Sequence, residues 1–353
     1  MKKKRDLSRR NFLKNTSLGL GGGIVGASML SCSQASAGKR EKLPGEVCIA
    51  AVDLKGLWPD STRESRIKRI LRRMEDAVTV KPDLLCLPEL FDTMWVDEEK
   101  PLPEVAEDEK VPGPVTGVIA EFANKHNCYI VCPLITKSEG HFYNSSILID
   151  RKGNIAGVYH KIHPTKTECI PDNAYKGGGI TPGALDQPAF ETDFGKVGML
   201  ICYDTNWSDG WDNLKKKGAE IVMFSSAFPG GRILNYYAMR NSCYVMSSTG
   251  SDARIIDISG NDLATSTLDV RFAWETINLN KISTPHWTGK QIPELLGKYG
   301  DRIKIKTWDY FDIMTIESRD PDLKLNDLIK EHKIETKDIL ISTSEEAQIK
   351  NRL

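Results

Sequence analysis

Short apolar runs alternate with amphipathic segments along most of this chain. An apolar run bounded by turn residues predicts a strand, and apolar residues that recur at helical spacing predict a helix. By these rules we expect strands over 45–54, 82–90, 128–135, 197–204, 221–228 and 243–250. We expect helices over 61–80, 116–127, 209–220 and 233–242, and Ser61 is the predicted N-cap of the first helix.

Two hairpins interrupt this alternation. The first is expected over 141–163 with its turn at Lys152 and Gly153, and the second over 253–267 around Ser259 and Gly260. Strand–helix–strand units mixed with hairpins predict an α/β fold with a layered sheet of parallel and antiparallel strands. We take 45–284 as this domain.

Residues 285–353 follow as a C-terminal extension. A helix is expected over 286–300, a strand pair over 303–318 and an amphipathic helix over 321–335. The aromatic side chains of Trp308, Tyr310 and Phe311 favour a folded segment over a disordered tail. We expect this extension to pack on the domain or on a partner subunit.

Residues 1–37 have the pattern of an export signal. The basic stretch MKKKRDLSRRNFLK precedes a weakly apolar, Gly-rich run that is short for a membrane span. Within it, SRRNFLK closely resembles the twin-arginine signal, which directs already folded proteins to export. The end of the signal stays open, because MLSC at Cys32 is an imperfect lipobox and ASA at 35–37 is an ordinary cleavage site. We expect a protein that is either periplasmic or lipid-anchored to a membrane through Cys32.

Charge and cysteine content exclude some classes of function. The chain carries 48 basic and 48 acidic side chains, which gives no sign of a nucleic-acid partner. Seven cysteines follow Cys32, an odd number with no CxxC pair, and most of them lie in apolar runs. These cysteines are predicted to be buried free thiols, which a protein folded in a reducing compartment before export would tolerate.

Three short strings place reactive side chains at the ends of predicted strands. Cys202 ends the apolar run in GKVGMLICYDTNW, Glu89 ends LLCLPEL, and Lys161 follows a hairpin strand in VYHKIHP. In layered α/β folds, sites open at the carboxyl ends of strands. A thiol there is a candidate nucleophile if a base can take its proton, and a carboxylate among apolar neighbours is a candidate base. Taken one at a time, the three residues could equally be a core thiol, a loop carboxylate and a solvated lysine.

Together the strings resemble the nitrilase (carbon–nitrogen hydrolase) superfamily over roughly residues 46–280. The order Glu, Lys, Cys and the spacing both fit that family. The resemblance implies a four-layer α-β-β-α sandwich, a homodimer or larger homo-oligomer, and no metal or organic cofactor. It also implies that Cys202 is the nucleophile and Glu89 the general base, while Lys161 and the backbone N–H of Tyr203 hold the oxyanion.

The same resemblance supplies candidates for substrate binding. Glu168 fits a second glutamate that the family often carries shortly after the lysine, since KIHPTKTE resembles a string of the true-nitrilase branch. The segment after the cysteine departs from the amidase pattern, with Asn206 in place of Arg and Trp207 in place of Phe. We therefore expect the pocket mouth to be lined by these residues and by a second segment: Asn206, Trp207, Ser226, Ala227 and Phe228.

These features favour hydrolysis of a non-peptide carbon–nitrogen bond in an amide or N-carbamoyl substrate. Nitrile hydrolysis is the alternative, supported by KIHPTKTE and opposed by Tyr203 and Asp204 directly after the cysteine. An acyltransferase is less favoured, because that branch of the family carries many membrane spans. An exported binding protein that kept the fold without its activity is the non-enzymatic alternative.

Overall fold

The computed structural model describes residues 42–57, 59–98, 100–170, 179–308 and 312–352. The predicted export signal, with Cys32, lies outside these residues, as do Tyr310 and Phe311. Within the described ranges, no helix combines the length and the apolar character needed to cross a bilayer.

The first sheet gathers strands from both ends of the predicted domain. Its order is β13-β1-β2-β4-β5-β6, with β3 on β4, which makes seven strands within the described residues. Strands β1, β2 and β4 run parallel, β13 pairs antiparallel with β1, β5 pairs antiparallel with β4, and β6 pairs antiparallel with β5. The strands are β1 (Glu46–Val52), β2 (Leu84–Cys86), β3 (Glu107–Asp108), β4 (Tyr129–Ser138), β5 (His141–Ile149), β6 (Ile155–His160) and β13 (Phe272–Asn278).

The second sheet is built from consecutive strands in the order β12-β11-β10-β9-β8-β7, six within the described residues. Its centre, β8 to β10, is parallel, and the outer pairs are antiparallel. The strands are β7 (Phe190–Glu191), β8 (Lys196–Ile201), β9 (Ile221–Ser226), β10 (Tyr244–Thr249), β11 (Ala253–Ile256) and β12 (Asp262–Thr265).

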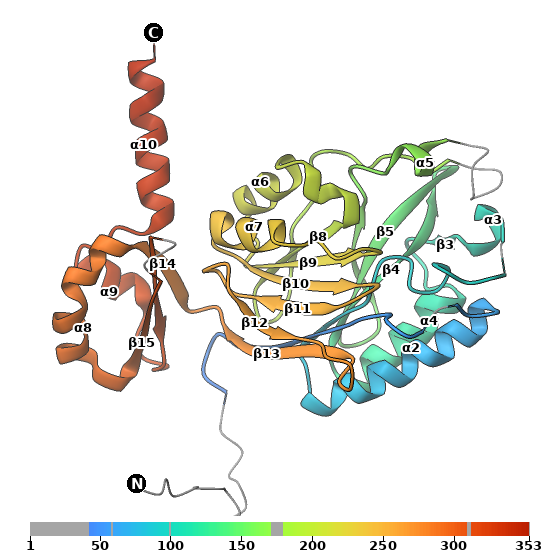
Figure 1. Cartoon of the computed structure of the whole chain (residues 1–353), viewed down its shortest axis with the longest axis horizontal. Coiled ribbons are helices and arrows are strands. Elements are labelled where there is room, and N and C mark those ends of the chain that lie inside the picture. The colour runs from blue at the N-terminus through green and yellow to red at the C-terminus, as the bar shows by residue number, and fades with distance from the viewer. Residues whose placement is uncertain (1–41, 58, 99, 171–178, 309–311, 353) are drawn as a thin grey trace, which may run out of the picture. The chain divides into compact units, whose positions relative to one another are not determined.

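Alternation along β1 shows how the layers form. Val47, Ile49 and Ala51 belong to the core that the two sheets share, whereas Ala50 and Val52 pack with the helices of the first sheet. Those helices are α2 (Arg63–Ala77) and α4 (Pro114–His126), and the outer face of the second sheet is covered by α6 (Asp209–Lys216) and α7 (Ile233–Asn241). Figure 1 shows the two helix pairs on opposite sides of the sheets. The predicted four-layer α-β-β-α sandwich is confirmed.

Hydrogen bonds join the two sheets where their parallel strands end. The Ser248 hydroxyl on β10 donates to the Val52 carbonyl on β1 at 2.5 Å. The Ser225 hydroxyl on β9 donates to the Leu87 carbonyl, just after β2, at 2.9 Å. Both bonds are buried, so they fix the carboxyl ends of four parallel strands against each other.

Several helices and strands begin or end at other residues than predicted. The N-cap of α2 is Thr62, whose hydroxyl accepts the Ser65 N–H at 3.1 Å, so the prediction of Ser61 was wrong. The helix ends at Ala77, and a 3₁₀ turn, η1 (Val78–Val80), completes the segment. Strand β2 has three residues where 82–90 was expected. Both hairpins form as predicted, with Gly153 and Gly260 at positive φ in their turns.

A third sheet, in the order β14-β16-β15 within the described residues, begins at Lys281, four residues before the predicted start of the C-terminal extension. Leu295, Met314, Ile316 and Leu328 belong to a separate core beside it. The strands β14 and β13 and the helix α10 were not predicted. The elements are β14 (Lys281–Pro285), η3 (His286–Gln291), α8 (Ile292–Tyr299), η4 (Gly300–Arg302), β15 (Ile303–Trp308), β16 (Ile313–Ser318), α9 (Leu325–Glu331) and α10 (Lys337–Asn351).

Candidate active site

The three residues singled out as reactive meet at one cavity of about 420 Å³. Glu89 lies in the turn after β2, Lys161 directly follows β6, and Cys202 directly follows β8. Glu168 also lines this cavity, on the short helix α5 (Lys166–Cys169). Two sheets and a loop helix therefore deliver four chemically active side chains to one place.

Lys161 is the centre of this group, and its side chain is only 1% exposed. Its Nζ lies 2.8 Å from Glu89 Oε1 and 3.0 Å from each carboxylate oxygen of Glu168. Burial alone would lower the pKa of Lys161, but the Glu89 and Glu168 carboxyl groups outweigh it and raise that pKa well above its usual range. Lys161 is consequently a fixed ammonium at neutral pH.

Glu168 is held by its own helix and by a neighbouring strand. Its Oε2 accepts the Thr165 N–H at 2.7 Å, while Thr165 Oγ1 accepts the Glu168 N–H, so the two residues form a capping box on α5. Burial would raise the pKa of Glu168, but Lys161, the Thr165 N–H and Asn144 lower it below its usual value. This carboxylate is ionised, and its orientation is set.

Asn144, on β5, links the two carboxyl groups and was not foreseen. Its Nδ2 donates to Glu89 Oε1 at 2.8 Å and to Glu168 Oε1 at 3.0 Å. The other oxygen of Glu89 accepts the Ala227 N–H at 2.8 Å from the turn after β9. A signal was present in the sequence, because an amide side chain stands at a fully buried position beside the apolar run SSILI.

Cys202 differs from the core cysteines in exposure and backbone. It is partly exposed and lines the cavity, and its φ is 45°, at the start of the 3₁₀ turn η2 (Cys202–Asn206). Burial and the Glu89 carboxyl group raise the pKa of Cys202 to about 12, although Lys161 and the Ser226 side chain oppose this shift. The resting sulfur is a neutral thiol, and a base must take its proton during attack.

Asp204 fixes this turn to the strand that carries Lys161, a role the sequence did not predict. Its Oδ2 accepts the Tyr159 hydroxyl at 2.6 Å and the Ile201 N–H at 2.8 Å. Its Oδ1 accepts the His163 N–H at 2.8 Å. One buried carboxylate thus joins the segments on which Lys161 and Cys202 lie.

The residues expected at the pocket mouth divide into two groups. Phe228 and Ala227 line the cavity, whereas Tyr203, Asn206, Trp207 and Ser226 are not among its lining residues. Trp207 stacks on His163 with ring centroids 4.2 Å apart, and Asn206 Nδ2 donates to the Tyr203 carbonyl at 3.0 Å. The rest of the lining was not predicted: Leu90, Met94, Trp95, Thr165 and Thr167.

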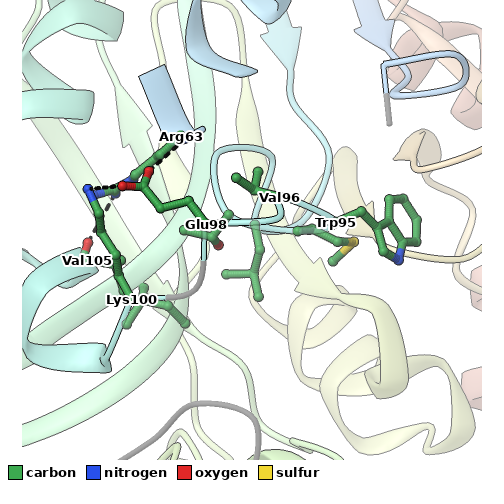
Figure 2. A pocket seen from close by; sticks show the side chains of 10 residues that line it. Arg63, Trp95, Val96, Glu98, Lys100 and Val105 are labelled. Carbon is green, nitrogen blue, oxygen red and sulfur yellow. Dashed lines mark hydrogen bonds and ion pairs between the residues drawn. The ribbon is translucent and has the colours of Figure 1, made fainter. Parts of the chain in front are cut away.

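A second cavity of about 510 Å³ lies against the same loop. Leu90, Met94 and Trp95 line both cavities and form the wall between them. Figure 2 shows Arg63, Glu98, Lys100 and Val105 gathered at one end of this second cavity and Trp95 at the other. Lys100 pairs with Glu98 at 3.2 Å, so the charged groups lie away from the shared apolar wall.

The described residues contain no cluster of three or more His, Cys, Asp and Glu side chains that could hold a metal ion. The chemistry available at the first cavity is that of a thiol beside a carboxyl group and a fixed ammonium. This set suits acyl transfer to sulfur with an electrostatically stabilised oxyanion.

The raised pKa of Cys202 predicts how alkylation of its thiol depends on pH. With iodoacetamide, the rate at Cys202 should rise about tenfold per pH unit between pH 7 and pH 9, because the thiolate is a small and growing fraction. The Glu89→Gln substitution should raise this rate about tenfold at pH 8, because loss of the carboxylate lowers the pKa of the thiol.

Peptide mapping by mass spectrometry would give the rate at each cysteine. Cys169 is exposed and serves as the internal standard, and the fully buried Cys86 and Cys132 should stay unmodified in both proteins. A slower reaction of Cys202 in the Glu89→Gln variant would contradict the account of the thiol pKa given above.

Comparison with known proteins agrees with this geometry. The family model for carbon-nitrogen hydrolases matches residues 48–271. The chain is 33% identical over 154 residues to the β-ureidopropionase of Arabidopsis thaliana, covering 42% of this chain and 36% of that protein. It is 27% identical over 194 residues to the ω-amidase NIT3 of Saccharomyces cerevisiae, covering 53% and 65% respectively.

Solved structures share the fold at low sequence identity. Nit3 of Saccharomyces cerevisiae, described as a member of branch 10 of the nitrilase superfamily, matches with a TM-score of 0.55 and 20% identity over 67% of this chain and 92% of that one. A mutant amidase from Nesterenkonia sp. AN1, with the acetamide moiety of fluoroacetamide added covalently at its active site cysteine, matches with a TM-score of 0.55 and 16% identity over 68% and 94%.

The curated relatives are matched over 36–65% of their own lengths, so the chain spans less than two thirds of each. The family match is broader with respect to this chain, since residues 48–271 make up more than half of its 353 residues. The chain therefore belongs to the carbon–nitrogen hydrolase family of the nitrilase superfamily.

Proposed function

We propose that this protein hydrolyses a non-peptide carbon–nitrogen bond in an amide or N-carbamoyl substrate, through a thioester on Cys202. The observation that carries the proposal is the buried Lys161 ammonium, which lies between Glu89 and Glu168 in the cavity that also holds the Cys202 thiol. A charge set of this kind is costly to bury and has a chemical use beside a thiol.

In the first step, Glu89 takes the proton of the Cys202 thiol as the sulfur attacks the carbonyl carbon. A carbon–sulfur bond forms, and the carbonyl π electrons move onto oxygen. The Lys161 ammonium and the backbone N–H of Tyr203 stabilise the resulting oxyanion. The carbon–nitrogen bond then breaks, and the nitrogen leaves as ammonia or an amine with the proton that Glu89 returns.

In the second step, water replaces the amine. Glu89 accepts a proton from the water as its oxygen attacks the thioester carbon, and the carbon–sulfur bond breaks with return of the proton to sulfur. The carboxylic acid leaves, and Cys202 is again a thiol. Glu168 and Asn144 act by orienting Lys161 and Glu89 through the hydrogen bonds described above.

The names of the relatives agree with this class of reaction. An ω-amidase and a β-ureidopropionase support amide and N-carbamoyl substrates. Nitrile hydrolysis is the second candidate, carried by the KIHPTKTE string and by similarity to a protein named nitrilase from Pyrococcus abyssi, which is 29% identical over 174 residues. Hydrolysis releases a free acid, whereas a non-catalytic binding protein or an acyltransferase would release none.

Substitution of the reactive residues tests this function. The Cys202→Ala change should abolish ammonia release from the best substrate of a panel of amides, N-carbamoyl amino acids and nitriles, a loss of at least about 10³-fold in kcat/KM. The Glu89→Gln change should cost a comparable factor, because no other carboxyl group in the described cavity contacts the thiol. In wild-type protein, mass spectrometry of quenched reactions should show the acyl group on the Cys202 peptide.

Cys169→Ser is the matched control, since Cys169 is an exposed cysteine next to Glu168 that does not line the cavity. It should keep kcat/KM within about twofold. Ammonia release that persists in Cys202→Ala protein would exclude the thioester mechanism.

We also propose a homodimer or larger homo-oligomer, with the C-terminal extension as one contact. Helix α10 has no buried residue, and it exposes Ile339, Ile341 and Ile349. Deletion of 337–353 should therefore reduce the number of subunits per particle, calculated from the molar mass in light scattering. An unchanged number of subunits would mean that α10 is not part of the interface.

Export by the twin-arginine route remains our proposal for residues 1–37. Replacing Arg9 and Arg10 by Lys should retain the full-length precursor in the cytoplasm, as read by fractionation and immunoblotting. Labelling with a palmitate analogue distinguishes the two ends of the signal: label that is lost in Cys32→Ser protein indicates a lipid anchor, and absent label indicates a periplasmic protein.

A further inference from the structure

We propose that the acyl pocket selects substrates whose acyl group is uncharged and apolar, aromatic groups included, and discriminates against monoamides of dicarboxylic acids. This inference rests on the proposed function and names its substrate class. It follows from the apolar residues that line the cavity and from the charges of the remaining lining residues.

The cavity has an apolar wall that is partly exposed. Leu90, Met94, Trp95, Ala227 and Phe228 contribute it, from the loop after β2 and the turn after β9. The rings of Trp95 and Phe228 contact edge to face, with centroids 6.2 Å apart and an interplanar angle of 82°. Phe228 is 64% exposed and Trp95 is 38% exposed. Large exposed aromatic side chains that converge on one cavity mark a binding surface for an apolar group.

The loop that carries Leu90, Met94 and Trp95 is fixed by hydrogen bonds to its backbone. Trp95 has a φ of 55° and Leu90 a φ of 45°, an uncommon conformation for such bulky residues. The side chain of Arg66, fully buried on α2, donates to the Met94 carbonyl at 2.7 Å and to the Trp95 carbonyl at 3.3 Å. Its Nε also pairs with Asp60 at 2.7 Å, so a buried ion pair fixes the backbone of this loop. Strained, over-determined backbone beside a reactive thiol indicates a wall with a functional role.

The charged residues of the cavity account for the discrimination against monoamides of dicarboxylic acids. Among the described residues that line the cavity, Lys161 is the one basic side chain, and its ammonium already contacts Glu89 and Glu168. A carboxylate on the acyl group would enter a site lined by two carboxyl groups and by no second basic side chain among the described residues. The nearby Lys100 lines the second cavity and pairs with Glu98, so it leaves the apolar wall without charge. Burying an unpaired carboxylate there is unfavourable, and the extra contacts of the longer acyl group do not offset that penalty.

A matched pair of substrates tests the inference with the wild-type protein. Succinamate and 4-methylpentanamide have the same length and shape, and the carboxylate of the first is an isopropyl group in the second. The kcat/KM for 4-methylpentanamide should exceed that for succinamate by at least about tenfold. 3-Phenylpropanamide should be hydrolysed at least as well as 4-methylpentanamide, because its ring can lie against Trp95 and Phe228.

A substitution at Thr167 should reverse the preference. Thr167 is exposed and lines the same cavity. Thr167→Lys should raise the ratio of kcat/KM for succinamate over 4-methylpentanamide by about tenfold, because it adds an uncommitted ammonium. Thr167→Met has a side chain of similar reach without charge, and it should leave the ratio within about twofold.

The role of Phe228 is also tested through a ratio of kcat/KM values for two amides. A smaller fraction of folded protein lowers both values equally and leaves the ratio unchanged. Phe228→Ala should lower kcat/KM for 3-phenylpropanamide by about tenfold, because truncation removes aromatic contact area. Acetamide, whose acyl group carries a single methyl, is the reference substrate, so the ratio of kcat/KM for 3-phenylpropanamide over acetamide should fall by about tenfold. Equal losses for both amides would mean that Phe228 does not contact the acyl group.

The outcomes separate this inference from the proposed function. If no amide, acetamide included, acylates Cys202 or releases ammonia, the proposed hydrolase function fails. If succinamate is hydrolysed as well as its isostere in a reaction that requires Cys202, the hydrolase stands and the inference on substrate class is overturned.

Discussion

The buried ammonium of Lys161 is the constraint around which the site is organised. Its position at 1% exposure requires compensating negative charge, and Glu89 and Glu168 supply it at 2.8 and 3.0 Å. Asn144 then bonds one oxygen of each carboxyl group, so that neither can turn away from the ammonium. The three charged side chains come from the ends of β2 and β6 and from α5. These segments must lie together, because each buried charge needs the opposite charge of its neighbour.

This arrangement also determines the state of the thiol. Glu89 is oriented by Lys161, by Asn144 and by the Ala227 N–H, and it faces Cys202 as a proton acceptor. The same carboxyl group raises the pKa of the thiol, so the sulfur stays protonated until a substrate arrives. A resting thiol is less prone to unwanted oxidation than a thiolate.

The two sheets have to meet accurately for this chemistry, because Glu89 and Lys161 come from the first and Cys202 from the second. The hydroxyl–carbonyl bonds of Ser225 and Ser248 and the buried carboxylate of Asp204 hold the strand ends in register across the sandwich. The loop after β2 carries Glu89, the proposed general base, and Leu90, Met94 and Trp95 of the apolar wall. Under this proposal, reaction and acyl selection depend on one loop whose backbone the buried Arg66 fixes.

The sequence by itself determined the layered fold and the residues of the reactive centre. Period-two and helical patterns are local, so the longer strands and helices of 45–267 could be read from neighbouring residues, with errors of a few positions such as Thr62 for Ser61. The short elements α3 (Leu102–Val105), β3, α5 and β7 were missed. Glu89, Lys161 and Cys202 stood out because each ends a strand, and Glu168 because of its spacing from Lys161.

Tertiary structure alone decided the partners and the walls of the site. Strand β13 pairs with β1 although more than 200 residues separate them, and no local pattern encodes that pairing. Asn144 and Asp204 became visible as organising residues only when their bonds across strands were known. Trp95 and Phe228 were likewise joined by the fold, whereas Trp207, which the sequence favoured for the pocket, turned to stack on His163. Contacts of this kind depend on where the sheets place distant segments, and a side chain's neighbours in sequence do not specify that.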